Sequence, residues 1–150
     1  LNQRDIGDVW AFDLTTMVWS QYMDVCGFVP TPRSSTLHLK WDQFILLFGG
    51  DGNGETYSDL FLFNLETGVW SKVEMPAGLE PRMAGRAALI ENTTVLHESQ
   101  TTLTTKSVIL YLFGGRVLRN DMTRVASNDL VSLELRGTQE HSRFCCARNF

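Results

Sequence analysis

The chain has 150 residues, of which 43% are apolar and 20% charged, and its formal net charge is −4. This composition is typical of a globular domain and excludes a disordered chain. The negative charge argues against nucleic acid as a partner, because phosphate binding needs clustered lysine and arginine. No apolar run approaches the roughly 18 residues that a spanning helix requires, so we expect no membrane segment.

The first predicted element covers residues 5–22. It contains Asp8-Val9-Trp10-Ala11-Phe12-Asp13-Leu14, with Trp19 five residues further on. The same pattern returns after 51 residues, in the segment 59–65 followed by Trp70. Short strands that repeat with a period near 50 residues are typical of propeller blades. Residues 1–5 carry neither an initiator methionine nor a signal pattern, which indicates a start within a longer chain.

Residues 32–73 hold one complete repeat of four predicted strands. The first strand follows Pro32-Arg33, and the second ends at Gly49-Gly50. The third begins at Asp59, and the fourth contains Trp70. Apolar residues occupy both faces of the third strand, because side chains alternate along a strand. This pattern indicates sheets that are stacked between neighbouring sheets.

Residues 81–135 hold a further, partial repeat. It has Pro81-Arg82, a strand that ends at Gly114-Gly115, and Asp129-Leu130, but no tryptophan after Leu135. The threonine-rich insertion 91–107 is too polar for a core, and we expect it to extend a hairpin or to be disordered on the opposite face. The insertion is also long enough to contact a second protein partner. The tail, residues 136–150, is left unassigned.

The ordered set of Gly-Gly, Tyr57 two residues before Asp59, and Trp70 resembles Kelch repeats. The resemblance covers about residues 5–135. It implies an all-β fold, a Kelch-type β-propeller fragment of four-stranded antiparallel blades, with the rest of the propeller on a longer chain. For most members it also implies a rigid, non-catalytic scaffold that binds a protein partner and needs no cofactor.

Residues that recur in the repeats are predicted to be structural. We expect Trp19 and Trp70 to be buried between blades, and Gly49, Gly50, Gly114 and Gly115 to form turns rather than a phosphate loop. Arg33 and Arg82 are predicted to make structural ion pairs near the axis; the alternative is that they grip an acidic group in the central channel.

Function is therefore expected where the repeats differ. The predicted loops 51–58, 116–128, 23–31 and 74–80 share one face of a four-stranded blade array. Loop 116–128 combines arginine with exposed apolar residues, a composition that is enriched at protein interfaces. We therefore expect it to contact a partner; the alternative is that it is only a solvated loop. The predicted partner-binding residues are Arg116, Val117, Leu118, Arg119, Met122, Arg124, Asp51, Asn53 and Glu55.

Other chemistry is weakly supported. The alternative function is a metal-dependent enzyme or specifier-type factor, but His38, His97 and His141 lack ligand spacing and no catalytic set is visible. The residues that follow Asp51 do not match the ligand pattern of a calcium-binding loop, so we expect a flexible turn and no metal there.

Three cysteines without a Cys-x-x-Cys pair indicate neither zinc nor disulfides. They favour the cytoplasm or nucleus over secretion, despite the sequon at Asn92. Because open blade faces invite self-association, we also expect the isolated chain to aggregate or oligomerise.

Overall fold

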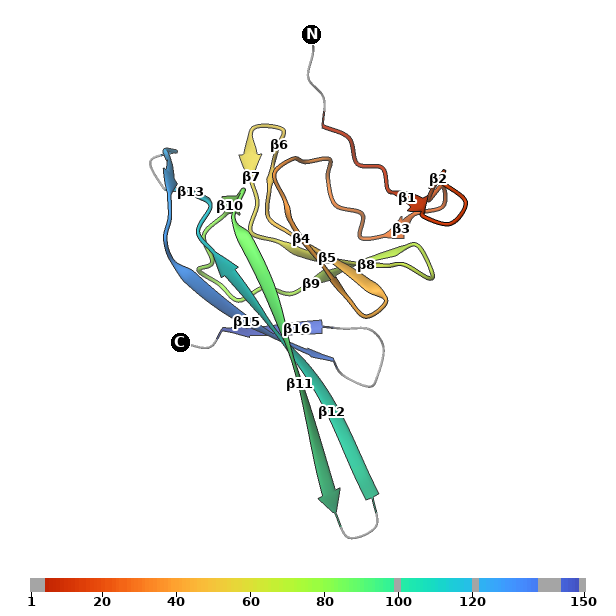
Figure 1. Cartoon of the computed structure of the whole chain (residues 1–150). Helices are drawn as coiled ribbons and strands as arrows, with labels where there is room; N and C mark the ends of the chain where they lie inside the picture. The colour runs from red at the N-terminus through yellow and green to blue at the C-terminus, as the bar shows by residue number, and fades with distance from the viewer. Residues whose placement is uncertain (1–4, 99–100, 120–121, 138–143, 149–150) are drawn as a thin grey trace.

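The computed structural model describes residues 5–98, 101–119, 122–137 and 144–148. These residues form β-strands and turns without any helix (Figure 1), which confirms the predicted all-β fold. Among them, accordingly, no helix has the length and apolarity that crossing a bilayer requires. Residues 99–100 of the insertion, and 138–143 and 149–150 of the tail, lie outside this description.

The first blade is an antiparallel sheet that corresponds to the complete repeat. Its strands are β4 (Leu37–Trp41), β5 (Phe44–Phe48), β8 (Leu60–Asn64) and β9 (Val69–Val73). They pair in chain order, each with the next. A short strand, β3 (Cys26–Gly27), runs parallel to β9 beyond it. Part of the segment 23–31, which we predicted to be a loop, therefore belongs to the sheet edge.

The second blade consists of β11 (Arg86–Glu98), β12 (Thr101–Phe113), β15 (Leu130–Gly137) and β16 (Phe144–Arg148), in that order and antiparallel. β11 and β12 pair from Arg86 opposite Phe113 to Glu98 opposite Thr101. The insertion 91–107 thus extends this hairpin, which is one of the two predicted alternatives. β16 comes from the unassigned tail and supplies a fourth strand beside β15.

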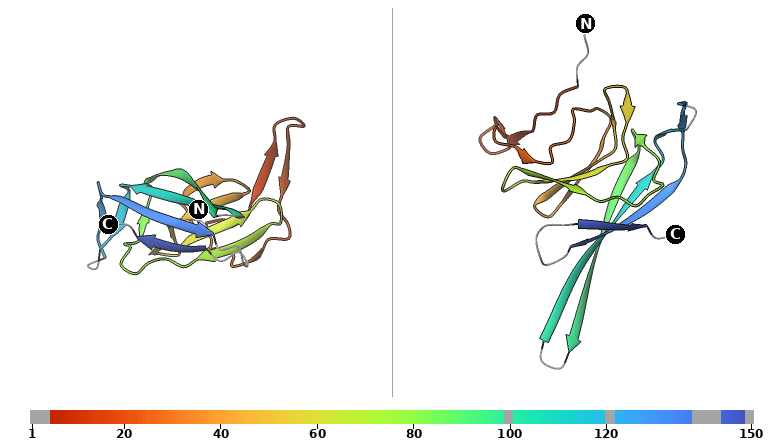
Figure 2. Two further views of the ribbon diagram at one scale, coloured as in Figure 1. Left: turned by 90° about the horizontal axis from the view of Figure 1, so that it is seen from below. Right: turned by 180° about the vertical axis from the view of Figure 1, so that it is seen from behind.

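The remaining strands form smaller sheets. β1 (Trp10–Asp13) and β2 (Val18–Gln21) form an antiparallel pair, which we call the half-blade. β6 (Asp51–Gly52) and β7 (Glu55–Thr56) form a short hairpin after the first double glycine. β10 (Arg82–Met83), β13 (Arg116–Leu118) and β14 (Arg124–Ala126) form a three-stranded sheet. The long β11–β12 hairpin projects away from β6, β7 and β13, as Figures 1 and 2 both show.

The main core lies between the two blades. Because strand side chains alternate, Leu46 and Phe48 face the second blade while Ile45 and Leu47 face the other way. The full set of buried members is Leu37, Leu46, Phe48, Leu60, Leu62, Val73, Leu79, Val108, Leu110, Leu112, Val131, Leu133 and Leu135. Burial of each large side chain contributes about 1.5–3 kcal/mol. The two blades are thus stacked, as the apolar faces of their strands predicted.

The opposite face of the first blade carries a smaller core. Phe61, Phe63 and Trp70 are buried there, packed against Val9 and Tyr22 at the ends of the half-blade. Tyr22 meets the ring of Phe63 edge-on, at 5.1 Å between centroids. The half-blade therefore covers only part of this face.

Trp19 is a correction to the sequence analysis. We expected it to be buried like Trp70, but its exposed fraction is 62% against 5%. Its ring packs only on Phe12 of its own hairpin among the ring contacts of the described residues. The prediction was wrong because a repeat pattern assigns a side chain to a face, whereas burial also needs a second sheet over that face.

Candidate functional site

The double glycines form turns with left-handed backbone. Gly49 and Gly50 have φ values of 62° and 98°, and Gly114 and Gly115 have 63° and 90°. A Cβ atom on Gly49 would lie 2.4 Å from the carbonyl oxygen of Arg82. Glycine is needed both for these dihedral angles and for this close approach of two chain segments. Both pairs therefore have the backbone role that we predicted.

Arg33 ties the start of the first blade to Asp59, which directly precedes β8. Its Nη1 atom lies 2.6 Å from Asp59 Oδ1, and the arginine side chain is only 4% exposed. The same Nη1 donates to the carbonyl of Gly49 at 3.2 Å, and the guanidinium stacks 3.9 Å above the centre of the Tyr57 ring. The guanidinium group of Arg33 thus has its partners within its own blade.

Arg82 repeats this arrangement in the second blade. Its Nη1 and Nη2 atoms donate to the two carboxylate oxygens of Asp129 at 3.2 and 2.9 Å. These hydrogen bonds are the main cause that lowers the pKa of Asp129 below 3.8; partial burial opposes them, and the Ser127 hydroxyl assists. Both arginines therefore form ion pairs within their own blades, as we predicted.

The predicted loop 51–58 is largely a paired hairpin. Asn53 and Gly54 form its turn with φ values of 54° and 80°, the left-handed pair that two-residue hairpins favour. Thr56 Oγ1 donates to Asp51 Oδ1 at 3.1 Å. Asn53 and Glu55 are exposed on either side of the turn. Two of the predicted contact residues are therefore accessible here.

The predicted loop 116–128 is also a hairpin, formed by β13 and β14. Arg116, Arg119, Met122 and Arg124 are exposed, and Leu118 is half-buried. Val117 is a correction: it was predicted to contact a partner, but it is only 2% exposed. The segment forms a strand, so side chains alternate and Val117 faces inward between two outward neighbours. Residues 120–121 lie outside the described residues.

The two hairpins touch through an ion pair. Arg124 Nη2 lies 2.6 Å from Asp51 Oδ1, although the two residues are 73 positions apart in the sequence. Sequence reasoning assigned both residues to the same face but gave no signal that they pair. We call the surface made by β6–β7 and β13–β14 the hairpin face. All nine predicted contact residues lie on these two hairpins, and Val117 is the one that is fully buried.

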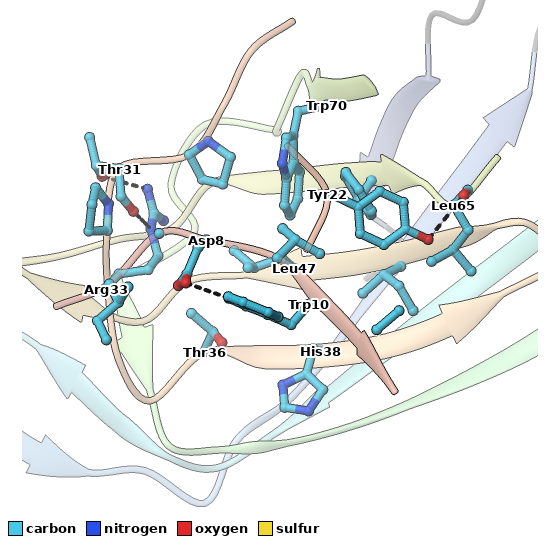
Figure 3. Close-up of a pocket in the computed structure, with 18 residues that line it drawn as sticks. Asp8, Trp10, Tyr22, Thr31, Arg33, Thr36, His38, Leu47, Leu65 and Trp70 are labelled. Carbon is cyan, nitrogen blue, oxygen red and sulfur yellow. Dashed lines mark hydrogen bonds between the residues drawn. The ribbon is translucent and has the colours of Figure 1, made fainter. Parts of the chain in front are cut away.

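A pocket of about 660 Å³ lies elsewhere, between the half-blade and the first blade (Figure 3). Its walls come from the segment before β1, from β4 and β5, and from Trp70. Trp10 Nε1 donates to Asp8 Oδ2 at 2.6 Å along one wall. Sequence reasoning missed this pocket because it depends on how two sheets are spaced.

Only one of the three histidines has a side chain among the described residues. His38 is exposed on β4 and lines the pocket. The side chains of His97 and His141 lie outside the described part of the chain. Within that part, no group of three histidine, cysteine or carboxylate side chains is placed to hold a metal ion. Cys26 is an exposed free thiol.

Comparisons with known proteins agree with this geometry. The family described as the KLHDC2/KLHL20/DRC7 Kelch-repeats domain matches residues 2–146. Two curated proteins of Arabidopsis thaliana, acyl-CoA-binding domain-containing proteins 4 and 5, are each 31% identical over 87 residues. Each match covers 56% of this chain and 13% of the relative, so the chain spans a small part of these longer proteins.

The family match fits three structural features described above: the stacked antiparallel blades, the left-handed double glycines and the buried tryptophan of the complete repeat. Kelch-repeat domains commonly mediate protein–protein interactions and are typically non-enzymatic. The chain belongs to the Kelch-repeat family, and it forms blades of a Kelch-type β-propeller.

Proposed function

We propose that this chain is a protein-interaction module that binds its partner through the hairpin face. The observation that carries the proposal is the Arg124–Asp51 ion pair, which joins the variable loops of two successive repeats into one surface. A surface shared by two blades can present a larger and more rigid contact area than either hairpin alone.

The composition of the hairpin face supports a protein partner. Arg116, Arg119 and Met122 are exposed on β13–β14 and the turn between them. Arginine and methionine are both enriched at protein interfaces, where arginine pairs with carboxylates and methionine adapts to irregular apolar surfaces. The partner expected from this chemistry is a protein segment that offers acidic groups beside an apolar side chain.

The scaffold and the contact residues are separable. Arg33 and Arg82 are buried in ion pairs, whereas the arginines of the hairpin face are exposed. An exposed pair such as Arg124–Asp51 contributes only about 0–1 kcal/mol to stability. Removing the exposed arginines is therefore expected to affect binding much more than folding.

The proposal is tested by site-specific cross-linking. A photo-reactive residue at position 122 should capture a partner protein, whereas the same residue at position 72, exposed on β9, should not. Replacing Arg116, Arg119 and Arg124 with alanine should abolish the capture at position 122 and leave the melting temperature nearly unchanged.

A matched control removes exposed positive charge from other strands. The variant Lys40→Ala/Lys72→Ala changes β4 and β9 and should retain capture at position 122. Capture that persists in the triple arginine variant, or that is equal from positions 122 and 72, would refute the hairpin face as the binding surface.

A further inference from the structure

Thr31 is the only serine or threonine of the chain that is followed by a proline. The other three of the four prolines follow Val29, Met75 and Glu80. Thr31 is exposed and lies between β3 and β4, outside the strands. A proline restricts the residue before it to an extended backbone. The hydroxyl of Thr31 is therefore presented to solvent on an extended segment, where a modifying enzyme can reach it.

The guanidinium group of Arg33 lies directly beside this hydroxyl (Figure 3). Arg33 Nη2 donates to Thr31 Oγ1 at 2.9 Å, and Nε donates to the carbonyl oxygen of Thr31 at 3.0 Å. Nη1 lies 2.6 Å from Asp59 Oδ1, but Nη2 lies 3.4 Å from Asp59 Oδ2. Nη2 is thus directed more closely at Thr31 than at Asp59. It can bind an anion on Thr31 while Nη1 keeps its carboxylate.

The second blade carries a permanent negative charge at the equivalent position. Glu80 stands before the Pro-Arg pair of that blade, as Thr31 stands before that of the first blade. Glu80 is exposed, so the fold accepts an anionic side chain at this place. Arg82 donates from both Nη atoms to Asp129, and its buried Nε atom has no hydrogen-bond partner among the described residues. Arg82 is therefore directed at Asp129 and not at residue 80.

The two repeats differ at this position in both charge and arginine geometry. The first blade has a neutral hydroxyl with a guanidinium donor directed at it, and the second has a fixed carboxylate without such a donor. A phosphate group on a hydroxyl adds about 1.5 to 2 negative charges and strong acceptor oxygens. Beside an arginine, these oxygens form short, charge-assisted hydrogen bonds. A phosphate on Thr31 would meet a donor that is already in place.

We propose that Thr31 is a phosphorylation site whose phosphate is bound by Arg33. The modifying enzyme is a protein kinase that recognises threonine before proline. It transfers the γ-phosphoryl group of a nucleoside triphosphate to Thr31 Oγ1. The bond from Oγ1 to hydrogen breaks, a bond from Oγ1 to phosphorus forms, and the nucleoside diphosphate and the proton leave. The phosphate oxygens then accept the hydrogen bond from Nη2 that the hydroxyl accepted before.

The first test measures modification of the folded chain. The 150-residue protein is incubated with a proline-directed kinase and ATP, and mass spectrometry locates the phosphate. Thr31 should be the main site, and Thr31→Ala should remove nearly all of the incorporated phosphate. Pro32→Ala keeps the hydroxyl and should have the same effect, because the kinase then lacks its recognition residue. Phosphate that reaches Thr31 only in the denatured chain, or that enters the Thr31→Ala chain equally well, would overturn the proposal.

The second test detects the contact between the phosphate and Arg33. A guanidinium group favours the doubly charged form of a phosphate. The second pKa of the phosphate on Thr31 should therefore be lower in the folded protein than in a phosphorylated peptide of residues 27–36. Asp59 opposes this effect, but its charge is already paired with Nη1. Titration followed by ³¹P NMR measures the pKa in both molecules, and equal values would refute binding by Arg33.

Glu80→Thr in the Thr31→Ala chain supplies a matched control. It creates the same Thr-Pro-Arg sequence in the second blade, where Asp129 holds both Nη atoms of Arg82. The phosphate at position 80 should titrate like that of the free peptide. An equal lowering of the pKa at positions 31 and 80 would assign the effect to the general charge of the protein and would overturn the role of Arg33.

Discussion

The half-blade β1–β2 and the strands β8–β9 are one sequence motif in two different surroundings. Their local geometry is the same: the rings of Phe12 and Trp19 lie 4.9 Å apart, as do those of Phe63 and Trp70. Their turns also agree, since Asp13 accepts hydrogen bonds from two backbone amides and Asn64 does the same.

Burial separates the two copies. Phe63 is 1% exposed and Phe12 37% exposed, and the two tryptophans differ even more. β8 has a neighbouring strand on both sides, whereas β1 has only β2 among the described strands. The motif therefore encodes a hairpin by itself, but the stability of that hairpin comes from the sheets that cover it.

The largest expected difference concerns the tryptophans. Trp70→Ala should lower the free energy of unfolding by about 3–5 kcal/mol, because a large buried ring is removed. Trp19→Ala should lower it by less than about 0.5 kcal/mol, because this ring is mostly exposed. Denaturant unfolding of both variants measures the difference. Equal losses would show that β1–β2 is packed as tightly as β8–β9.

The aspartates give the next largest difference. Asp59→Ala leaves the buried guanidinium of Arg33 without its carboxylate, which should cost about 3 kcal/mol. Asp8→Ala removes an exposed acceptor of one indole N–H and should cost less than about 1 kcal/mol. Thermal unfolding of the two variants, compared with the wild type, tests this order. A larger loss for Asp8→Ala would contradict it.

The turns should give a smaller and opposite pair of effects. Gly68 and Met17 hold the same position, with φ values of 70° and 57°. Gly68→Ala should cost about 1 kcal/mol, because residues with a Cβ disfavour this conformation. Met17→Gly should gain less than about 1 kcal/mol, since relief of strain exceeds the added chain entropy. Two stabilising or two destabilising results would show that the turns are not equivalent.

The smallest expected effect is the pH dependence of the half-blade turn. Hydrogen bonds from the backbone amides of Thr16 and Thr15 lower the pKa of Asp13 below 3.8. Because the folded pKa is the lower one, this contribution is complete above the unfolded value and is lost as the pH falls through the folded pKa. Asn64 cannot titrate, so the β8–β9 turn has no such dependence.

Amide chemical shifts of Thr15 and Thr16, followed from about pH 5 to pH 2, measure this effect. Asp13→Asn should abolish the titration, because an amide oxygen accepts the same bonds without ionising. A titration that persists in the variant would assign it to another group.

The features that follow from short-range pattern were predictable from sequence. The repeat spacing predicted the strands and their order, and the double glycines predicted the turns. Pro32-Arg33 and Pro81-Arg82 marked side chains that recur in equivalent positions, and the structure shows both arginines in ion pairs.

Features that depend on distant segments were not predictable in this way. The tail at Phe144 carries none of the repeat signals, so only its pairing with β15 identifies β16 as a strand. Val117 was expected on a loop surface, but strand formation turns it inward. The Arg124–Asp51 pair joins two repeats across 73 positions, a distance over which periodicity carries no pairing information.

Native-state amide hydrogen exchange tests most directly whether surroundings, rather than the motif, set stability. We predict that amides of Leu60–Asn64 exchange mainly through global unfolding. Those of Trp10–Asp13 should exchange through local opening, at least about a hundredfold faster after correction for intrinsic rates. Equal protection of the two segments would contradict the account, because the same motif would then be equally stable with and without sheets on both sides.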